Sequence, residues 1–449
     1  MRRRFLKDLI AADKFFARRN SKGLRLALEH AFERAEDRVY LDDLIRLVFR
    51  EIADIDGLPP TVAAFASAFA RRGRTGLASP VVAEPRRRTA GLEFDFLGDR
   101  RSPEDWTISQ FLSCLELRST APSSRAAVVG AMRDDGIYAI EWIAHYQCLG
   151  FDPVVVYSND NVDSSERLLR RLAEHDQIIF VESVTSGRVR PEVKAFEHAL
   201  HFVDEVRACE WALFVDSDEL FVPAAKYGGQ IGAVLDDLHR RRDPASPSAV
   251  VYNWLWFNSG MVFERGPGLL MDRFRYATPN WLTKPLVRLR DLLSMRLQHI
   301  PEMFPGAVIV DSSYRPIDVA HAWEPKSAVY DGGGVNHYWP KSFQEFSLKK
   351  ARGDALPLED DEYRRSFSLF FRWNAPETAE TFSPPDENLL ARVKERCAAL
   401  RALPGVSEAE AEVERRFTAL LDRYRDDGGL EQIYRTLRST TEYGQQPTV

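Results

Sequence analysis

The stretch Trp211-Ala-Leu-Phe-Val-Asp-Ser-Asp-Glu-Leu-Phe221 (WALFVDSDELF) decides the fold. Its first five residues are apolar without alternation, which is typical of a strand buried on both faces of a parallel sheet. The acidic residues Asp216 and Asp218 follow directly. Because alternate residues of an extended chain point to the same side, both carboxylates can face one ligand. Such a pair suits a divalent cation bound to a diphosphate.

Three shorter apolar runs precede this stretch and are separated by segments of helical periodicity. The predicted strands are 126–131, 153–157, 178–181 and 211–215, and the predicted helices are 140–149, 164–175 and 193–209. Regular alternation of strand and helix predicts an α/β fold with a parallel sheet beneath helices. Right-handed crossovers would place the C-terminal ends of the strands along one edge, where ligands bind in open α/β sheets.

The composition is that of an ordinary globular protein, with 45% hydrophobic and 29% charged residues and a net charge of -6. The lack of a basic excess argues against a nucleic-acid partner. Four scattered cysteines form no CxxC pair, which favours the reducing cytoplasm. No apolar run reaches the ~18 residues needed to cross a bilayer. The basic residues 2–4 would allow only weak peripheral association with the inner face of a membrane.

The chain divides into four segments by sequence pattern. We expect an N-terminal helical segment over 1–70, a linker or wrapping segment over 71–120, a catalytic domain over 121–375, and a C-terminal helical segment with a disordered tail over 376–449. The helical ends could mediate homo-oligomerisation or packing on the catalytic domain.

Four blocks between residues 126 and 353 resemble the GT-A glycosyltransferases of the family-2-like and family-92-like group. They contain Arg133-Asp134-Asp135 with Glu141-Trp142-Ile143, then 150–164, then 211–221, then Asn336-His337-Tyr338 with Lys341-Ser342, Glu345-Phe346, Lys349 and Arg352-Gly353. Where the group usually has Asn-Glu, this chain has Asp134-Asp135. The resemblance implies a GT-A fold, which is a Rossmann-like, mostly parallel sheet flanked by helices.

The resemblance also implies a metal-assisted transfer of sugar from a nucleotide-sugar donor, UDP-linked by preference, to a glycan or lipid-linked acceptor. Asp216 and Asp218 would hold Mn²⁺ or Mg²⁺, with His337 as the third protein ligand. Residues that would bind the donor follow the strands or lie on later elements: Arg133, Asp135, Asn159, Asp160, Lys284, Arg288, Lys341, Lys349 and Arg352. Lys and Arg suit a departing nucleoside diphosphate, since its negative charge must be stabilised.

The general base that an inverting transfer needs is not identified by the sequence. Glu219 is one candidate, and Glu264, Asp272 and Asp311 are others. Inversion and retention therefore both stay open. Two other functions also remain: a nucleotidyltransferase on a similar sheet, and a non-catalytic carbohydrate-binding or scaffold protein. The aromatic strand 252–257 could shape an acceptor cleft, although a plain core strand explains its pattern equally well.

Overall fold

The computed structural model describes Cys114, Leu117 and residues 121–183, 191–241, 246–295, 298–304, 306–317, 327–351, 367–374, 381–383 and 385–442. The segment expected over 1–70 and nearly all of that over 71–120 lie outside the described residues, as do Arg352 and the tail 443–449.

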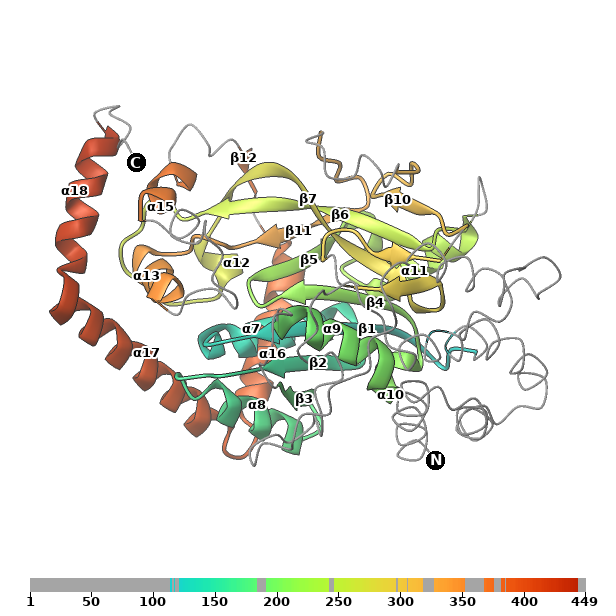
Figure 1. The fold of residues 1–449 in the computed structure, drawn as a ribbon, viewed down its shortest axis with the longest axis horizontal. Coiled ribbons are helices and arrows are strands. Elements are labelled where there is room, and N and C mark those ends of the chain that lie inside the picture. The colour runs from blue at the N-terminus through green and yellow to red at the C-terminus, as the bar shows by residue number, and fades with distance from the viewer. Residues whose placement is uncertain are drawn as a thin grey trace, which may run out of the picture.

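The described residues form one ten-stranded sheet, whose main path runs β3-β2-β1-β4-β7-β6-β11-β5 (Figure 1). The first four strands of this path are parallel, β7 is antiparallel to β4 and β6, and β5 is antiparallel to β11. The strands are β1 (Ser124–Met132), β2 (Val154–Ser158), β3 (Ile179–Glu182), β4 (Cys209–Asp216), β5 (Glu219–Pro223), β6 (Ala249–Asn258), β7 (Tyr276–Arg288), β10 (Ile309–Asp311), β11 (Gly333–His337) and β12 (Thr381–Phe382). A separate ribbon pairs β8 (Leu292–Ser294) with β9 (Glu302–Met303).

Helices cover both faces of this sheet because side chains alternate along each buried strand. In β1, Val128 belongs to one apolar cluster and Val129 to the other. The first cluster packs against α7 (Gly136–Leu149), α8 (Ser165–Glu174) and α11 (Ile231–Arg240), and the second against α9 (Pro191–Phe202) and α10 (Asp204–Arg207). The α/β architecture with a GT-A type of sheet, expected from the sequence, is thus confirmed.

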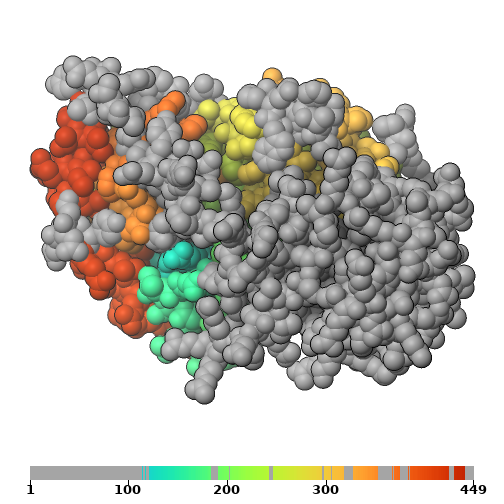
Figure 2. All heavy atoms as spheres, in the orientation of Figure 1, coloured from blue at the N-terminus to red at the C-terminus, as the bar shows by residue number. Residues whose placement is uncertain are grey.

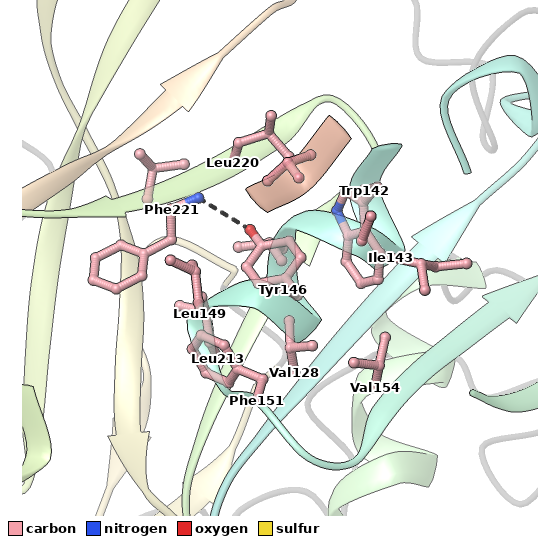
Figure 3. Close-up of a cluster of buried hydrophobic side chains, with 14 of the residues drawn as sticks. Val128, Trp142, Ile143, Tyr146, Leu149, Phe151, Val154, Leu213, Leu220 and Phe221 are labelled. Atoms are coloured by element: carbon pink, nitrogen blue, oxygen red, sulfur yellow. Dashed lines mark hydrogen bonds between the residues drawn. The ribbon is translucent and has the colours of Figure 1, made fainter. Parts of the chain in front are cut away.

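Helix α7 fixes the position of the turn between β4 and β5. The hydroxyl of Tyr146 donates to the carbonyl of Glu219 (3.0 Å) and accepts from the backbone N–H of Phe221 (3.2 Å), as Figure 3 shows among the surrounding apolar side chains. The indole Nε1 of Trp142 donates to the carbonyl of Asp216 (3.0 Å). A Cβ at Gly130 would lie 2.5 Å from the Trp142 ring, so only glycine leaves room for this contact. Side chains of α7 therefore fix the acidic turn through hydrogen bonds to its backbone.

Shorter helices follow the sheet strands on the side of the acidic turn: α12 (Leu270–Arg273), α13 (Phe343–Ala351) and α15 (Phe367–Trp373). The chain then continues into α16 (Glu387–Arg401), which packs beside α7, and into α17 (Val406–Gly428) and α18 (Leu430–Glu442), which run along one flank of the molecule (Figures 1 and 2). Apolar residues of α16 and α17, such as Val393 and Val413, belong to the same core cluster as Val128 of β1. In the described part of the chain, no helix has the length and apolarity needed to span a bilayer.

Candidate functional site

The turn between β4 and β5 carries Asp216 and Asp218 at the C-terminal edge of the parallel strands. The neighbouring strand β11 brings His337 opposite Glu219 in the antiparallel register. The backbone N–H of Tyr338 donates to the carbonyl of Asp218 (2.9 Å). The end of β11 and the acidic turn are thus joined by the sheet itself.

The carboxylate of Asp218 is buried and surrounded by cationic groups. Its Oδ2 accepts from the ammonium groups of Lys341 (3.2 Å) and Lys349 (2.5 Å), and its Oδ1 lies 3.5 Å from Nε2 of His337. Burial acts to raise the pKa of Asp218, but the two lysines outweigh it and hold this pKa well below its usual range. Asp218 is therefore ionised across the physiological pH range.

The imidazole of His337 lies beside this carboxylate and is neutral. Burial lowers its pKa below the ordinary value of 6.5, against the opposing effect of Asp218. The Nδ1 atom is buried and has no hydrogen-bond partner. A neutral imidazole is the form in which histidine binds metal ions.

The carboxylate of Asp216 pairs with the fully buried ammonium of Lys284 (2.9 Å), which also lies 3.2 Å from Oε2 of Glu219. Burial alone would lower the pKa of Lys284, but the two carboxyl groups raise it above its ordinary value. For Glu219, burial and the charge of Asp216 raise the pKa to about 8, although Lys284 opposes them. At neutral pH the charge of Lys284 is therefore balanced mainly by Asp216.

Glu192, at the start of α9, is a neighbour of this group that sequence reasoning missed. Its carboxyl hydrogen-bonds to Asp216, and burial and that charge raise its pKa well above its ordinary value. Pro191 before it is a helix-start signal, but the sequence holds no sign that this helix begins beside the acidic turn. Glu192 therefore faces Asp216 as a neutral acid that donates a proton in the hydrogen bond.

The loops after β1 and β2 are joined to each other and to the acidic turn. The hydroxyl of Ser217 donates to Asp135 (2.7 Å), and Oδ1 of Asp134 accepts from the backbone N–H of Val162 (2.6 Å). Arg133 lies beside Asp134, with 3.9 Å between Nε and a carboxylate oxygen. Asp135 of the β1 loop thus contacts the acidic turn directly, as Lys284, Lys341 and Lys349 do.

Asn159 and Asp160 lie at the same edge, at the end of β2. The amide of Asn159 is buried and donates to Asp160 at 3.5 Å, while Asp160 is exposed and has a φ of 46°. Ser158 before them donates to the carbonyl of Met132, which ties the ends of β1 and β2 together (2.9 Å). The two residues are therefore near the Arg133 loop.

A cavity open to solvent lies in front of these loops. It is lined by Asp135 and Tyr138 on the β1 side, by Lys341 and Lys349 around α13, and by Phe417 and Leu420 of α17. Figure 2 shows the C-terminal helices in red along this flank, against the orange segment that holds α13 and the green segment that holds α8. Sequence reasoning missed the contribution of α17, because its amphipathic pattern gives no hint of which cavity it borders.

Helix α13 is fixed by a capping box. Ser342 donates through its hydroxyl (2.6 Å) and its backbone N–H (3.0 Å) to Glu345, whose own N–H donates back to the Ser342 hydroxyl. Arg273 and Tyr138 also donate to Glu345. Lys349 lies on this helix and Lys341 directly precedes the capping residue Ser342, so the capping box holds both lysines next to Asp218.

Arg288 does not join this site. It pairs with Trp211 at the opposite end of β4, where its guanidinium contacts Asp291 (2.6 Å) and Ser248 (3.2 Å). Lys284 and Arg288 are four residues apart on one strand, which separates them by about 13 Å. The structure therefore brings Lys284, but not Arg288, to the acidic turn, and Arg352 lies outside the described residues.

A divalent cation fits this site by the type of its donor atoms. Two carboxylates and one imidazole are acceptable ligands for Mn²⁺, and the carboxylates also suit Mg²⁺. The orphaned Nδ1 of His337 is consistent with a polar ligand nearby. Among the described residues, however, no group of three or more His, Cys, Asp or Glu is arranged as a metal site. The lysine ammonium groups take the positions beside both aspartates.

Comparison with known proteins shows which family the segment around the acidic turn is similar to. Residues 137–262, which include the acidic turn, match the model of glycosyltransferase family 92. A solved structure from S. aureus, TarS 1–349 in complex with UDP, matches with 15% identity over 67% of this chain and 91% of that chain, at a TM-score of 0.25. No curated protein matches the sequence. Residues 137–262 are thus similar to glycosyltransferase family 92, and the α/β sheet with its acidic turn is of the GT-A type expected from the sequence.

Proposed function

We propose that this chain acts as a glycosyltransferase that moves a sugar from a UDP-linked donor to a glycan or lipid-linked acceptor, and that the donor diphosphate binds between Asp218 and the ammonium groups of Lys341 and Lys349. The observation that carries the proposal is the contact of Asp218 with Lys341 and Lys349 at the rim of an open cavity. Buried ammonium groups stabilise phosphate oxygens strongly because water does not screen them.

In the proposed reaction, the bond between the sugar C1 and the diphosphate oxygen breaks as the acceptor oxygen bonds to C1. The proton of the acceptor hydroxyl passes to a base, and the negative charge stays on the departing diphosphate. Lys341 and Lys349 would stabilise that charge as it develops. Asp135, at the β1 loop, would contact the nucleoside, because it lines the same cavity as the two lysines.

We propose Mn²⁺ or Mg²⁺ as the cofactor, held by Asp216, Asp218 and His337. When bound, the cation supplies Lewis-acid stabilisation of the diphosphate. The chain's own ammonium groups outnumber the two ionised aspartates, since Lys284, Lys341 and Lys349 all contact them. These lysines therefore contribute positive charge whether or not a cation is present.

A screen of nucleotide-sugars for release of free nucleotide tests the proposal. We expect release from a UDP-sugar, with loss of about 10²-fold or more in Asp218→Asn, because a preorganised electrostatic group is removed. Asp236→Asn is the matched control, since Asp236 is exposed and pairs only with Arg125 on the far side of the fold. Equal rates in the two variants would contradict the assignment of Asp218.

The cofactor is tested separately, by titrating Mn²⁺ or Mg²⁺ into protein treated with a chelator. We expect UDP to raise the melting temperature more strongly with the cation than without it. His337→Ala should reduce that difference. An identical shift with and without cation would remove the metal from the proposal while leaving the lysine contacts in place.

A further inference from the structure

Four tryptophans gather on the face of the sheet next to the acidic turn, and we name Trp254, Trp256, Trp339 and Trp373 the tryptophan cluster. Trp256 is its centre: its ring stacks on Trp373 (4.8 Å between centroids), and it lies 5.5 Å from Trp339 and 6.2 Å from Trp254. Trp256, Trp339 and Trp373 are half-buried, so the cluster is partly accessible from outside.

The cluster touches the candidate site through His337. The rings of Trp254 and Trp256 lie 4.2 Å and 5.1 Å from the imidazole, which in turn lies 3.5 Å from Asp218. Trp339 lines the cavity that also holds Lys349 and Asp135, and the ammonium of Lys349 is 5.6 Å from its ring. The tryptophan cluster therefore adjoins the proposed donor cavity, and Trp339 belongs to both.

Two indole N–H groups of the cluster have no partner. Nε1 of Trp254 and Nε1 of Trp256 are buried and make no hydrogen bond, and Trp254 as a residue is only 7% exposed. A buried donor without a partner is costly to the fold, and a phenylalanine would fill the same apolar space without that cost. The unpaired donors thus point to a ligand that brings hydrogen-bond acceptors.

We propose that the tryptophan cluster is the acceptor subsite and that the acceptor is a pyranose sugar. A pyranose ring offers an apolar C–H face that stacks on an indole, and hydroxyls that accept hydrogen bonds from the unpaired indole N–H groups. The inference rests on the proposed transfer from a nucleotide-sugar. A lipid phosphate would need cations of its own, whereas the ammonium group beside the cluster, that of Lys349, already serves the proposed donor diphosphate.

The test separates sugar binding from donor chemistry. Methyl pyranosides of glucose, galactose, mannose and N-acetylglucosamine are titrated against the full chain by calorimetry in the presence of UDP, and nucleotide release from the donor is measured without any acceptor. We expect at least one glycoside to bind, Trp256→Ala to weaken that binding by about tenfold or more, and Trp254→Phe to weaken it by about three- to tenfold. Nucleotide release without acceptor reports the donor chemistry of the wild-type protein.

Trp211→Phe is the matched control for Trp254→Phe. It also removes a buried indole N–H without a partner, but at the opposite end of β4 from the acidic turn. It should leave glycoside binding unchanged. Circular dichroism and the melting temperature confirm that each variant is folded.

The inference is overturned if no glycoside binds, if a polyprenyl phosphate in detergent binds instead, or if the Trp254 and Trp256 variants bind like the wild type. Failure of the proposed function looks different: no nucleotide-sugar releases nucleotide in the wild-type protein. Direct glycoside binding still decides the role of the cluster in that case, because it does not depend on turnover.

Discussion

Removal of the buried ammonium of Lys284 gives the sharpest test of the charge balance beneath the acidic turn. Lys284→Met keeps the length of the side chain, which is fully buried in β7, and deletes its contacts with Asp216 and Glu219. At pH 7 Glu219 is protonated, because its pKa is raised to about 8. The stability that Lys284→Met loses at this pH is therefore mainly that of the contact between Lys284 and Asp216. A hydrogen bond to a charged group contributes about 1.5–3 kcal/mol. The Asp216 side chain is 32% exposed, so we expect the lower end, about 1.5 kcal/mol.

At higher pH the loss should grow. The folded pKa of Glu219 lies above its unfolded value, so the stability that the neutral carboxyl contributes is present at low pH and is lost as pH rises through the folded pKa. Near pH 9 Glu219 is ionised in the wild type and pairs with Lys284. In Lys284→Met the pKa of Glu219 rises further, so the carboxyl stays protonated near pH 9, and above pH 8 the variant continues to lose about 1.4 kcal/mol of stability per pH unit where the wild type no longer does.

The assay is urea unfolding at pH 7 and pH 9, followed by tryptophan fluorescence. The difference in unfolding free energy between wild type and Lys284→Met should rise from about 1.5 to about 3 kcal/mol. The reference pair is Glu219→Gln and the double variant Lys284→Met/Glu219→Gln, in which the neutral amide should abolish the increase. A difference that is equal at the two pH values, or an increase that survives in the reference pair, would refute the reasoning.

Three further predictions address the cavity and its supports. Lys349→Met should lower nucleotide release by about 10²-fold through loss of one electrostatic contact, whereas Lys350→Met, whose ammonium lies over a phenylalanine ring, should change it by less than about twofold; equal effects in kinetic assays would separate Lys349 from the site. Burial raises the pKa of Glu141 to about 7 from 4.5, so stability should fall as pH rises through 7, and Glu141→Gln should flatten the melting temperature between pH 5 and pH 8; an unchanged pH profile would contradict this. Phe417→Ala should raise the Kd of UDP by about tenfold in calorimetry, because the ring forms part of the cavity wall, and an unchanged Kd would show that α17 does not reach the nucleotide.

The parallel half of the fold could be predicted because its strands are buried on both faces. Apolar runs alone therefore mark β1 to β4, whose observed bounds differ from the predicted ones by one or two residues. Helix α7 starts at Gly136, earlier than the predicted 140, since a carboxylate oxygen of Asp163 accepts the Gly136 N–H from another loop (3.0 Å). The predicted helix 193–209 is divided near Val203, which has an extended conformation. A contact between distant segments thus accounts for the early start of α7.

The candidate site could be predicted in part for a similar reason. Asp216 and Asp218 lie on a short turn whose position follows from the strand pattern, and the resemblance brought His337, Lys341 and Lys349 to it. The partners of Lys284 could not be predicted, because the antiparallel insertion of β7 between β4 and β6 decides which residues the ammonium reaches. Arg288 shows the opposite case, since a spacing of four residues keeps groups together on a helix but separates them on a strand.

The C-terminal helices α16 and α17 pack into the same core as the sheet that carries the acidic turn. Leu389 and Val393 of α16 are buried in the same apolar cluster as Val128 and Leu213 of the sheet, so removing them would expose the outer face of α7. That helix holds the acidic turn through Trp142 and Tyr146. The following helix, α17, lines the cavity in front of the turn. Because one continuous segment supports the turn from behind and borders the cavity in front, the site is complete only when the chain has folded as far as α17.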